Sequence, residues 1–94
     1  MGKIDPPVLT GSQLRAARAL LGVTAAELAD ETLIEVKTIR RAEARNHQPV
    51  LMTAANTRRI VDALETRGVQ FIPANGGGPG VRLATNPEQA GSVA

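Results

Sequence analysis

Basic side chains are concentrated in one short stretch near the middle of the chain. They are Lys37, Arg40, Arg41 and Arg45. The stretch just before them, residues 24–35, carries four acids and no base. Guanidinium and ammonium groups collected on one element neutralise phosphates, so this sorting of charge predicts a surface that binds a polyanion. The alternative is that these side chains only solvate one face of a helix.

Residue types that carry catalysis are scarce. The chain has no cysteine, which excludes disulfides, thiolate nucleophiles and cysteine-based zinc sites. His47 is the only histidine, with no second metal ligand and no Ser and Asp partners at useful spacing. We interpret it as a surface loop residue, with a phosphate contact as the alternative. The glycine run at residues 76–78 lacks the Lys-Ser/Thr of a phosphate-binding loop. We therefore expect neither an enzyme nor a metal or organic cofactor.

Length and composition indicate one small helical domain. The chain has 94 residues, of which 43% are hydrophobic, and Phe71 is the only aromatic residue. Such an aliphatic, alanine-rich composition favours packed helices over a sandwich or barrel. No apolar run approaches the roughly 18 residues of a membrane span, and no signal-peptide layout is visible. We expect a cytoplasmic protein.

The basic stretch lies on the second of two short predicted helices. Thr24 and Glu27 have the spacing of a capping box, which predicts a helix over residues 25–31. Residues 32–34 then interrupt the pattern, and a second helix is predicted over residues 36–44.

Longer predicted helices flank this pair. One spans residues 11–21, capped by Thr10 and ended by Gly22, and the other spans residues 54–67, capped by Thr53 and closed by Gly68. Their expected core faces are Leu14, Ala17, Leu20 and Leu21 in the first and Ile60, Val61 and Leu64 in the second.

The last third of the chain departs from the helical pattern. Residues 69–72 and 80–83 are short β-prone runs around a loop rich in Gly and Pro, which predicts an antiparallel hairpin within residues 69–84. We expect a flexible arm over residues 1–9 and a disordered tail over residues 85–94.

Two helices joined by a tight turn, with the second helix basic, have the layout of a DNA-reading helix-turn-helix. The stretch resembles the helix-turn-helix of the phage-repressor family (Cro/cI type, also called xenobiotic-response-element type). The matching residues are Thr24, Glu27, Leu28, Ala29, Ile34, Thr38, Ile39 and Glu43. The chain departs from the family at Leu33, where a turn glycine is usual, at Glu35, where Ser or Thr caps the second helix, and at Ala44-Arg45.

This resemblance implies a lambda-repressor-like bundle of four helices, with residues 10–68 as the DNA-binding domain and the second motif helix in the major groove. The base-reading candidates are Val36, Lys37 and Arg41, and the phosphate-binding candidates are Thr24, Ala25, Thr38, Arg40, Arg45, Thr53 and Asn56. By the same resemblance Arg18 forms a structural ion pair with Glu43. Glu35 is expected either to accept from a cytosine amino group or to cap its helix facing away from DNA.

The predicted hairpin is similar to the tail of many small bacterial regulators, which suggests that two chains pair through it. The residues of that seam would be Phe71, Ile72, Val81 and Leu83; the alternative is that the hairpin only packs on its own helices. The favoured function is sequence-specific binding of double-stranded DNA by a homodimeric, nucleoid-associated transcriptional regulator on a palindromic operator. The alternative is a protein-interaction module, antitoxin-like or a partner of the transcription machinery, with DNA binding secondary.

Overall fold

The computed structural model describes residues 8–85. The predicted arm and the predicted disordered tail therefore lie outside the described residues, apart from Val8, Leu9 and Thr85. Leu9 is already part of the core, with 2% of its surface exposed. Its carbonyl accepts a hydrogen bond from the amide of Val50 at 2.8 Å, so ordered packing begins within the last residues assigned to the arm.

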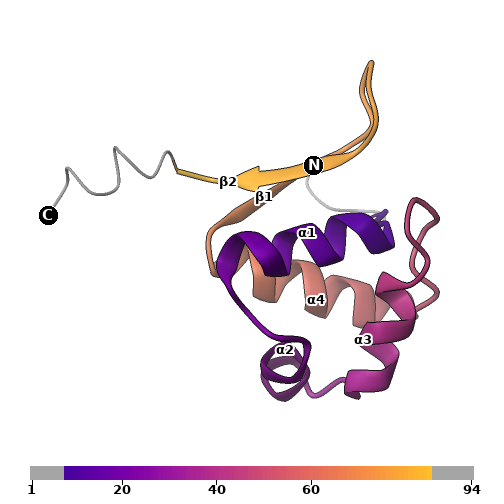
Figure 1. Ribbon diagram of the computed structural model, residues 1–94, viewed down its shortest axis with the longest axis vertical. Coiled ribbons are helices and arrows are strands. Elements are labelled where there is room, and N and C mark those ends of the chain that lie inside the picture. The colour runs from indigo at the N-terminus through magenta and orange to yellow at the C-terminus, as the bar shows by residue number, and fades with distance from the viewer. Residues whose placement is uncertain (1–7, 86–94) are drawn as a thin grey trace, which may run out of the picture.

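Within the described range the chain is mainly helical and ends in a two-stranded antiparallel sheet, as predicted. The elements are α1 (Gly11–Leu21), α2 (Ala25–Thr32), α3 (Val36–Glu43), α4 (Ala54–Thr66), β1 (Val69–Ile72) and β2 (Gly80–Leu83). The ends of α2, α3 and α4 each differ from the prediction by one residue. Figure 1 shows the hairpin lying over α1 and α4, with α2 and α3 on the far side of the molecule.

Side-chain caps fix where the helices begin. The Thr10 hydroxyl accepts from the amide of Gln13, whose side chain accepts from the amide of Thr10, and Thr24 and Glu27 repeat this box at α2. At α4 the Thr53 hydroxyl accepts from the amide of Asn56. These three caps confirm the predicted helix starts.

The core is aliphatic, as the composition predicts. Its fully buried large side chains are Leu9, Leu14, Leu28, Ile39, Ile60 and Leu64. Leu20 was expected in the core face of α1, and this prediction is wrong, because the residue is 45% exposed. One residue of helix turns the side chain by about 100°, which carries Leu20 past the edge of the face that contains Leu21.

Two faces of the hairpin have different environments. Val69 lies opposite Leu83 and Phe71 opposite Val81, and the aliphatic and aromatic side chains of these pairs pack against the helical core. Successive residues of a strand point to opposite faces, so Ile72 lies on the other face, over Gly80. Of the four residues expected at a dimer seam, three therefore contact their own chain, in line with the alternative prediction that the hairpin packs on its own helices.

Candidate nucleic-acid interface

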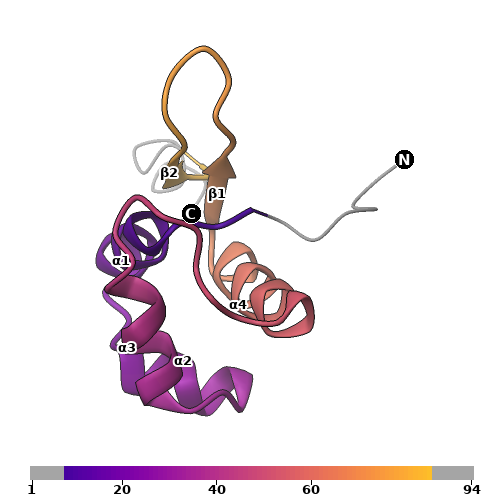
Figure 2. The same ribbon diagram turned by 90° about the vertical axis from the view of Figure 1, so that its right-hand side faces the viewer.

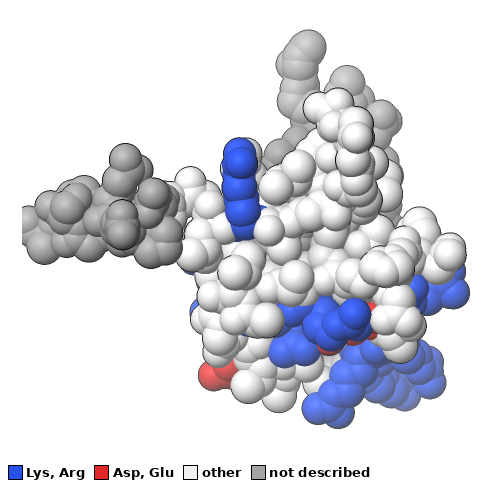
Figure 3. Space-filling view, turned by 45° about the horizontal axis from the view of Figure 1, so that its top comes forward, with Lys and Arg blue, Asp and Glu red and all other residues white. Residues whose placement is uncertain are grey.

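Helix α3 has one buried face and one basic face. Ile39 and Ala42 are buried in the core, whereas Lys37, Arg40 and Arg41 are exposed. At about 100° per residue these three side chains fall within roughly 100° of one another around the helix axis. In Figure 3 the largest group of Lys and Arg side chains is at the lower right, at the end of the molecule where Figure 1 places α3.

The basic side chains of α3 differ from most other basic side chains in the described range, because they have no hydrogen-bond or ion-pair partner. The side chains of Lys37, Arg40 and Arg41 make no hydrogen bond and no ion pair with any residue in the range 8–85. By contrast, Arg67 pairs with Glu31 at 2.6 Å and Arg82 donates to the Gln70 side chain at 2.8 Å. The charges of α3 are thus available to an external anion.

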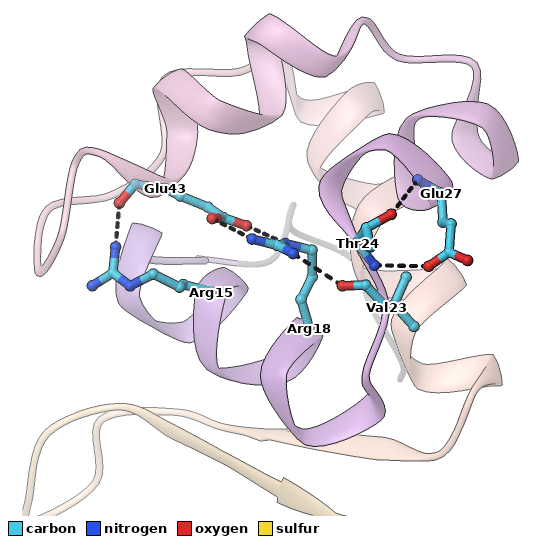
Figure 4. A network of polar contacts seen from close by, with 6 residues as sticks. All are labelled: Arg15, Arg18, Val23, Thr24, Glu27 and Glu43. Atoms are coloured by element: carbon cyan, nitrogen blue, oxygen red, sulfur yellow. Dashed lines mark hydrogen bonds and ion pairs between the residues drawn. The ribbon is translucent and has the colours of Figure 1, made fainter.

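Helix α1 holds the end of α3 through two arginines (Figure 4). Arg18 forms the predicted ion pair with Glu43, with 2.8 Å between Nη2 and Oε1, and also donates to the carbonyl of Val23 at 2.9 Å. Arg15 donates to the backbone carbonyl of Glu43 at 2.9 Å. Because the Glu43 carboxylate is neutralised by Arg18, the only acid of α3 does not offset its exposed bases.

The hydrogen bond to Glu43 raises the pKa of Arg18 above its ordinary value, against the opposing effect of burial, and the attraction of the carboxylate adds to the rise. The pair is largely shielded, since 20% of the Arg18 side chain and 9% of the Glu43 side chain are exposed. It orients α3 and presents no free charge to solvent.

The connection between α2 and α3 turns at Leu33, which adopts a left-handed conformation with φ 60° and is 84% exposed. Ile34 then enters the core with 5% of its surface exposed. Glu35 occupies the N-cap position of α3, but its side chain makes no capping bond, so of its two expected roles the side-chain cap is wrong and the contact with a cytosine amino group stays a prediction. Its carboxylate is exposed beside the start of the basic helix.

The start of α2 already holds an anion of its own. The Glu27 carboxylate accepts from the amide of Thr24 at 2.9 Å, and the Thr24 hydroxyl accepts from the amide of Glu27 at 3.0 Å (Figure 4). The hydrogen bond from the backbone amide of Thr24 lowers the pKa of Glu27, and the interaction of the carboxylate with the Thr24 side chain lowers it further. Ala25 is buried, so only its backbone amide is left to contact a phosphate.

The other phosphate candidates are spread over α3, its following loop and α4. Thr38 and Asn56 are half-buried, and Thr53 is exposed at the start of α4. Arg45 is half-buried and donates to the carbonyl of Pro49 at 3.2 Å, so part of its guanidinium is engaged. In Figure 2, α3 and the first turn of α4 face the reader.

The base-reading candidates have unequal exposure. Lys37 and Arg41 are exposed, whereas Val36 is half-buried and packs partly against the core. His47 is exposed in the loop after α3, where its Nδ1 lies 3.4 Å from the Ser12 hydroxyl. No group of acidic and histidine side chains suited to a metal ion occurs among residues 8–85.

Gly11 and Arg15 position α3, and sequence reasoning did not identify them. A Cβ on Gly11 would lie 2.4 Å from the carbonyl oxygen of Ala42 and 2.7 Å from that of Glu43, so only glycine allows α1 to approach the end of α3 this closely. The signal was available, because Gly11, Arg15 and Arg18 fall on one helical face at i, i+4 and i+7.

No protein-family model matches the sequence, and a search of the curated proteins returned no match. Among the described residues no helix has both the length and the apolar character needed to cross a bilayer.

Proposed function

We propose that the chain binds double-stranded DNA in a sequence-specific manner and regulates transcription, with α2 and α3 acting as a helix-turn-helix and α3 lying in the major groove. The observation that carries this proposal is the unpartnered basic face of α3, formed by Lys37, Arg40 and Arg41 on a helix whose opposite face is buried. An α-helix fits the major groove, where each base pair presents its own pattern of donors and acceptors.

In this proposal Lys37 and Arg41 donate to guanine O6 and N7, and Val36 contributes its exposed part to a thymine methyl group. Arg40 and the amide of Ala25 at the start of α2 bind phosphates, which set the register of the protein on the duplex. The Arg18–Glu43 pair and the Arg15 bond to Glu43 fix the angle of α3 against the body. A rigid helix supports base discrimination, because a displaced side chain loses its hydrogen-bond geometry.

A single module of this size makes few base contacts, so we propose that two chains bind a palindrome with half-sites about one helical turn apart. In this proposal the two chains pair through the outer edge of β1. Backbone hydrogen bonds along that edge would hold the two chains, because Phe71, Val81 and Leu83 already pack against their own core.

The test is protection mapping of the full-length protein on a pool of genomic DNA fragments, with sedimentation of the bound species. We expect a short protected palindrome and two chains per site. Equal binding to all fragments would mean that the basic side chains of α3 attract any polyanion without reading its sequence. Absence of binding in dilute salt would contradict the proposal outright.

A further inference from the structure

A groove lies between α1 and the start of β2, on a part of the molecule that the DNA proposal does not use. It contains a cavity of about 540 Å³, whose walls include Ser12 and Ala16 of α1, His47 of the loop after α3, and Pro79 and Val81 of the hairpin. That volume lies within the range of about 300–1,000 Å³ typical of ligand pockets. The walls contributed by Ala16, Pro79 and Val81 are apolar, and Ser12 and His47 supply hydrogen-bonding groups.

One side of this groove is a strand edge with open backbone groups. The amide of Ala84 donates to the carbonyl of Gly68 at 2.8 Å, which identifies these two opposite residues as a hydrogen-bonded pair of the antiparallel ladder. Bonded and non-bonded pairs alternate in an antiparallel ladder, so Val81 and Leu83 direct their N–H and C=O groups away from β1. Within residues 8–85 no third strand pairs with this edge.

Gln13 holds the strand at a fixed distance from the helix. Its side-chain amide donates to the carbonyl of Gly80 at 2.8 Å, and its carbonyl oxygen accepts from the amide of Thr10 at 3.0 Å. Only 4% of Gln13 is exposed, so this link is shielded from water. The groove is therefore part of the folded framework and does not depend on the glycine-rich tip alone.

The surroundings of the groove are basic. Helix α1 carries Arg15 and Arg18 with no acid, and residues 69–85 carry Arg82 with no acid. Arg18 is neutralised by Glu43, which leaves Arg15 and Arg82 exposed. A second copy that paired β2 with β2 about a two-fold axis would bring the two Arg82 side chains onto neighbouring strands, and like charges there are destabilising. The charge pattern favours an acidic partner over a second copy.

We propose that this groove binds an extended, acidic peptide segment of another protein, which adds as a third strand to the outer edge of β2. The segment places an aliphatic side chain in the cavity beside Ala16 and Val81. The carboxylate of an Asp or Glu in the same segment lies near Arg15 or Arg82. Main-chain hydrogen bonds to a strand edge supply affinity in such complexes, and the side-chain pocket supplies specificity. The interaction is independent of DNA binding.

The test uses a phage-displayed library of random heptapeptides panned against the full-length protein. We expect the enriched peptides to alternate aliphatic residues with at least one Asp or Glu. Ala16→Glu places a carboxylate in the groove and should weaken the synthetic form of an enriched peptide at least about tenfold. Ala19→Glu is the matched control, since Ala19 is also exposed on α1 but does not line the cavity, and it should bind like the parent.

A second measurement tests the mode of binding. The enriched peptide should shift the amide resonances of Val81 and Leu83, and the same peptide with alternate backbone nitrogens methylated should no longer bind, because it cannot complete the ladder. No enrichment, enrichment of basic peptides, or equal binding by Ala16→Glu would overturn the proposal. So would full binding by the methylated peptide, which indicates a side-chain pocket only. If dilution of the protein alone shifts the same resonances, a second copy occupies the edge and the proposal is wrong.

Discussion

Arg18 on α1 and Glu43 at the end of α3 are joined by hydrogen bonds from both Nε and Nη2 of the guanidinium to the two carboxylate oxygens. The planar guanidinium matches a carboxylate in this bidentate geometry, which fixes both the distance and the angle between the two helices. Since Glu43 also accepts from Arg15 through its backbone carbonyl, the last turn of α3 is attached to α1 at two points. The orientation of the basic face thus depends on a contact that is itself closed to solvent.

Removal of Glu43 should destabilise the fold. Glu43→Ala leaves Arg18 shielded without its partner, and loss of one member of a buried pair costs about 3–5 kcal/mol, with the lower end expected here because part of Arg18 is exposed. Chemical denaturation measures the change in the free energy of unfolding. Asp62→Ala is the control, since it removes the Arg58–Asp62 pair, whose carboxylate is 55% exposed, and should cost less than about 1 kcal/mol. An unchanged denaturation midpoint in Glu43→Ala would show that the pair has no role in stability.

Gly11 should not tolerate a side chain. The Cβ of Gly11→Ala would approach backbone atoms of Ala42, Glu43 and Asn46 at 2.8 Å or less, and backbone cannot move aside as a flexible side chain can. We expect a loss of roughly 1–3 kcal/mol, or more if α1 and α3 separate. Gly77→Ala is the control, because nothing lies within 4 Å of its added Cβ. Similar melting temperatures for the two variants would mean that α1 does not pack as closely on α3 as described.

Replacement of Leu33 by glycine should stabilise the fold. A left-handed conformation costs a non-glycine residue about 1–2 kcal/mol, and Leu33 recovers little of this by packing because it is 84% exposed. Leu33→Gly removes this strain but adds freedom to the unfolded chain, so we expect a net gain of up to about 1 kcal/mol. Leu33→Ala keeps the strain and should leave stability nearly unchanged. If glycine lowered the melting temperature as measured by calorimetry, the exposed leucine would have a stabilising contact that the fold does not reveal.

Acid should weaken the start of α2 through Glu27. The pKa of this carboxyl is lower in the folded state, so its contribution to stability is complete above the unfolded value near 4.5 and is lost as pH falls through the folded value. Glu27→Gln retains a capping side chain without the charge. We expect the parent to melt slightly higher than Glu27→Gln at neutral pH and the difference to shrink in acid. A difference that is constant from neutral pH to strong acid would contradict this assignment.

Local signals predicted most of the fold. Thr10, Thr24 and Thr53 each bond to the third amide of their helix, and such caps depend only on residues three positions apart, which a sequence displays directly. The strand limits at Val69 and Gly80 follow from equally local composition. Tertiary packing decided the remainder. Leu20 lies at the edge of a helical face, and only the neighbouring elements determine where that face ends.

In the candidate interface, too, features that depend on local sequence were predicted and most contacts between distant segments were not. Exposure of Lys37 and Arg41 follows from the period of α3, because Ile39 and Ala42 mark its buried side. The bond from Arg15 to the Glu43 carbonyl and the approach of Gly11 to α3 join segments about thirty residues apart. The sequence places Gly11, Arg15 and Arg18 on one helical face, but it does not show which element that face contacts. The family resemblance supplied the Arg18–Glu43 pair only because both partners occupy motif positions.

Substitution of Arg41 and substitution of Arg40 should affect DNA binding in different ways if α3 reads DNA. Arg41→Ala removes a base contact in our proposal, which should cost roughly 1–3 kcal/mol on the operator and relax the preference at one base pair. Arg40→Ala removes a phosphate contact, which should weaken operator and random DNA alike and reduce the slope of log K against log salt by about 1. Fluorescence anisotropy over a salt series, with operator and scrambled duplexes, measures both effects. Arg82→Ala is the control, an exposed arginine on the hairpin that should bind DNA like the parent. Equal losses for all three variants would mean that overall charge, and not the position of α3 in a groove, determines binding.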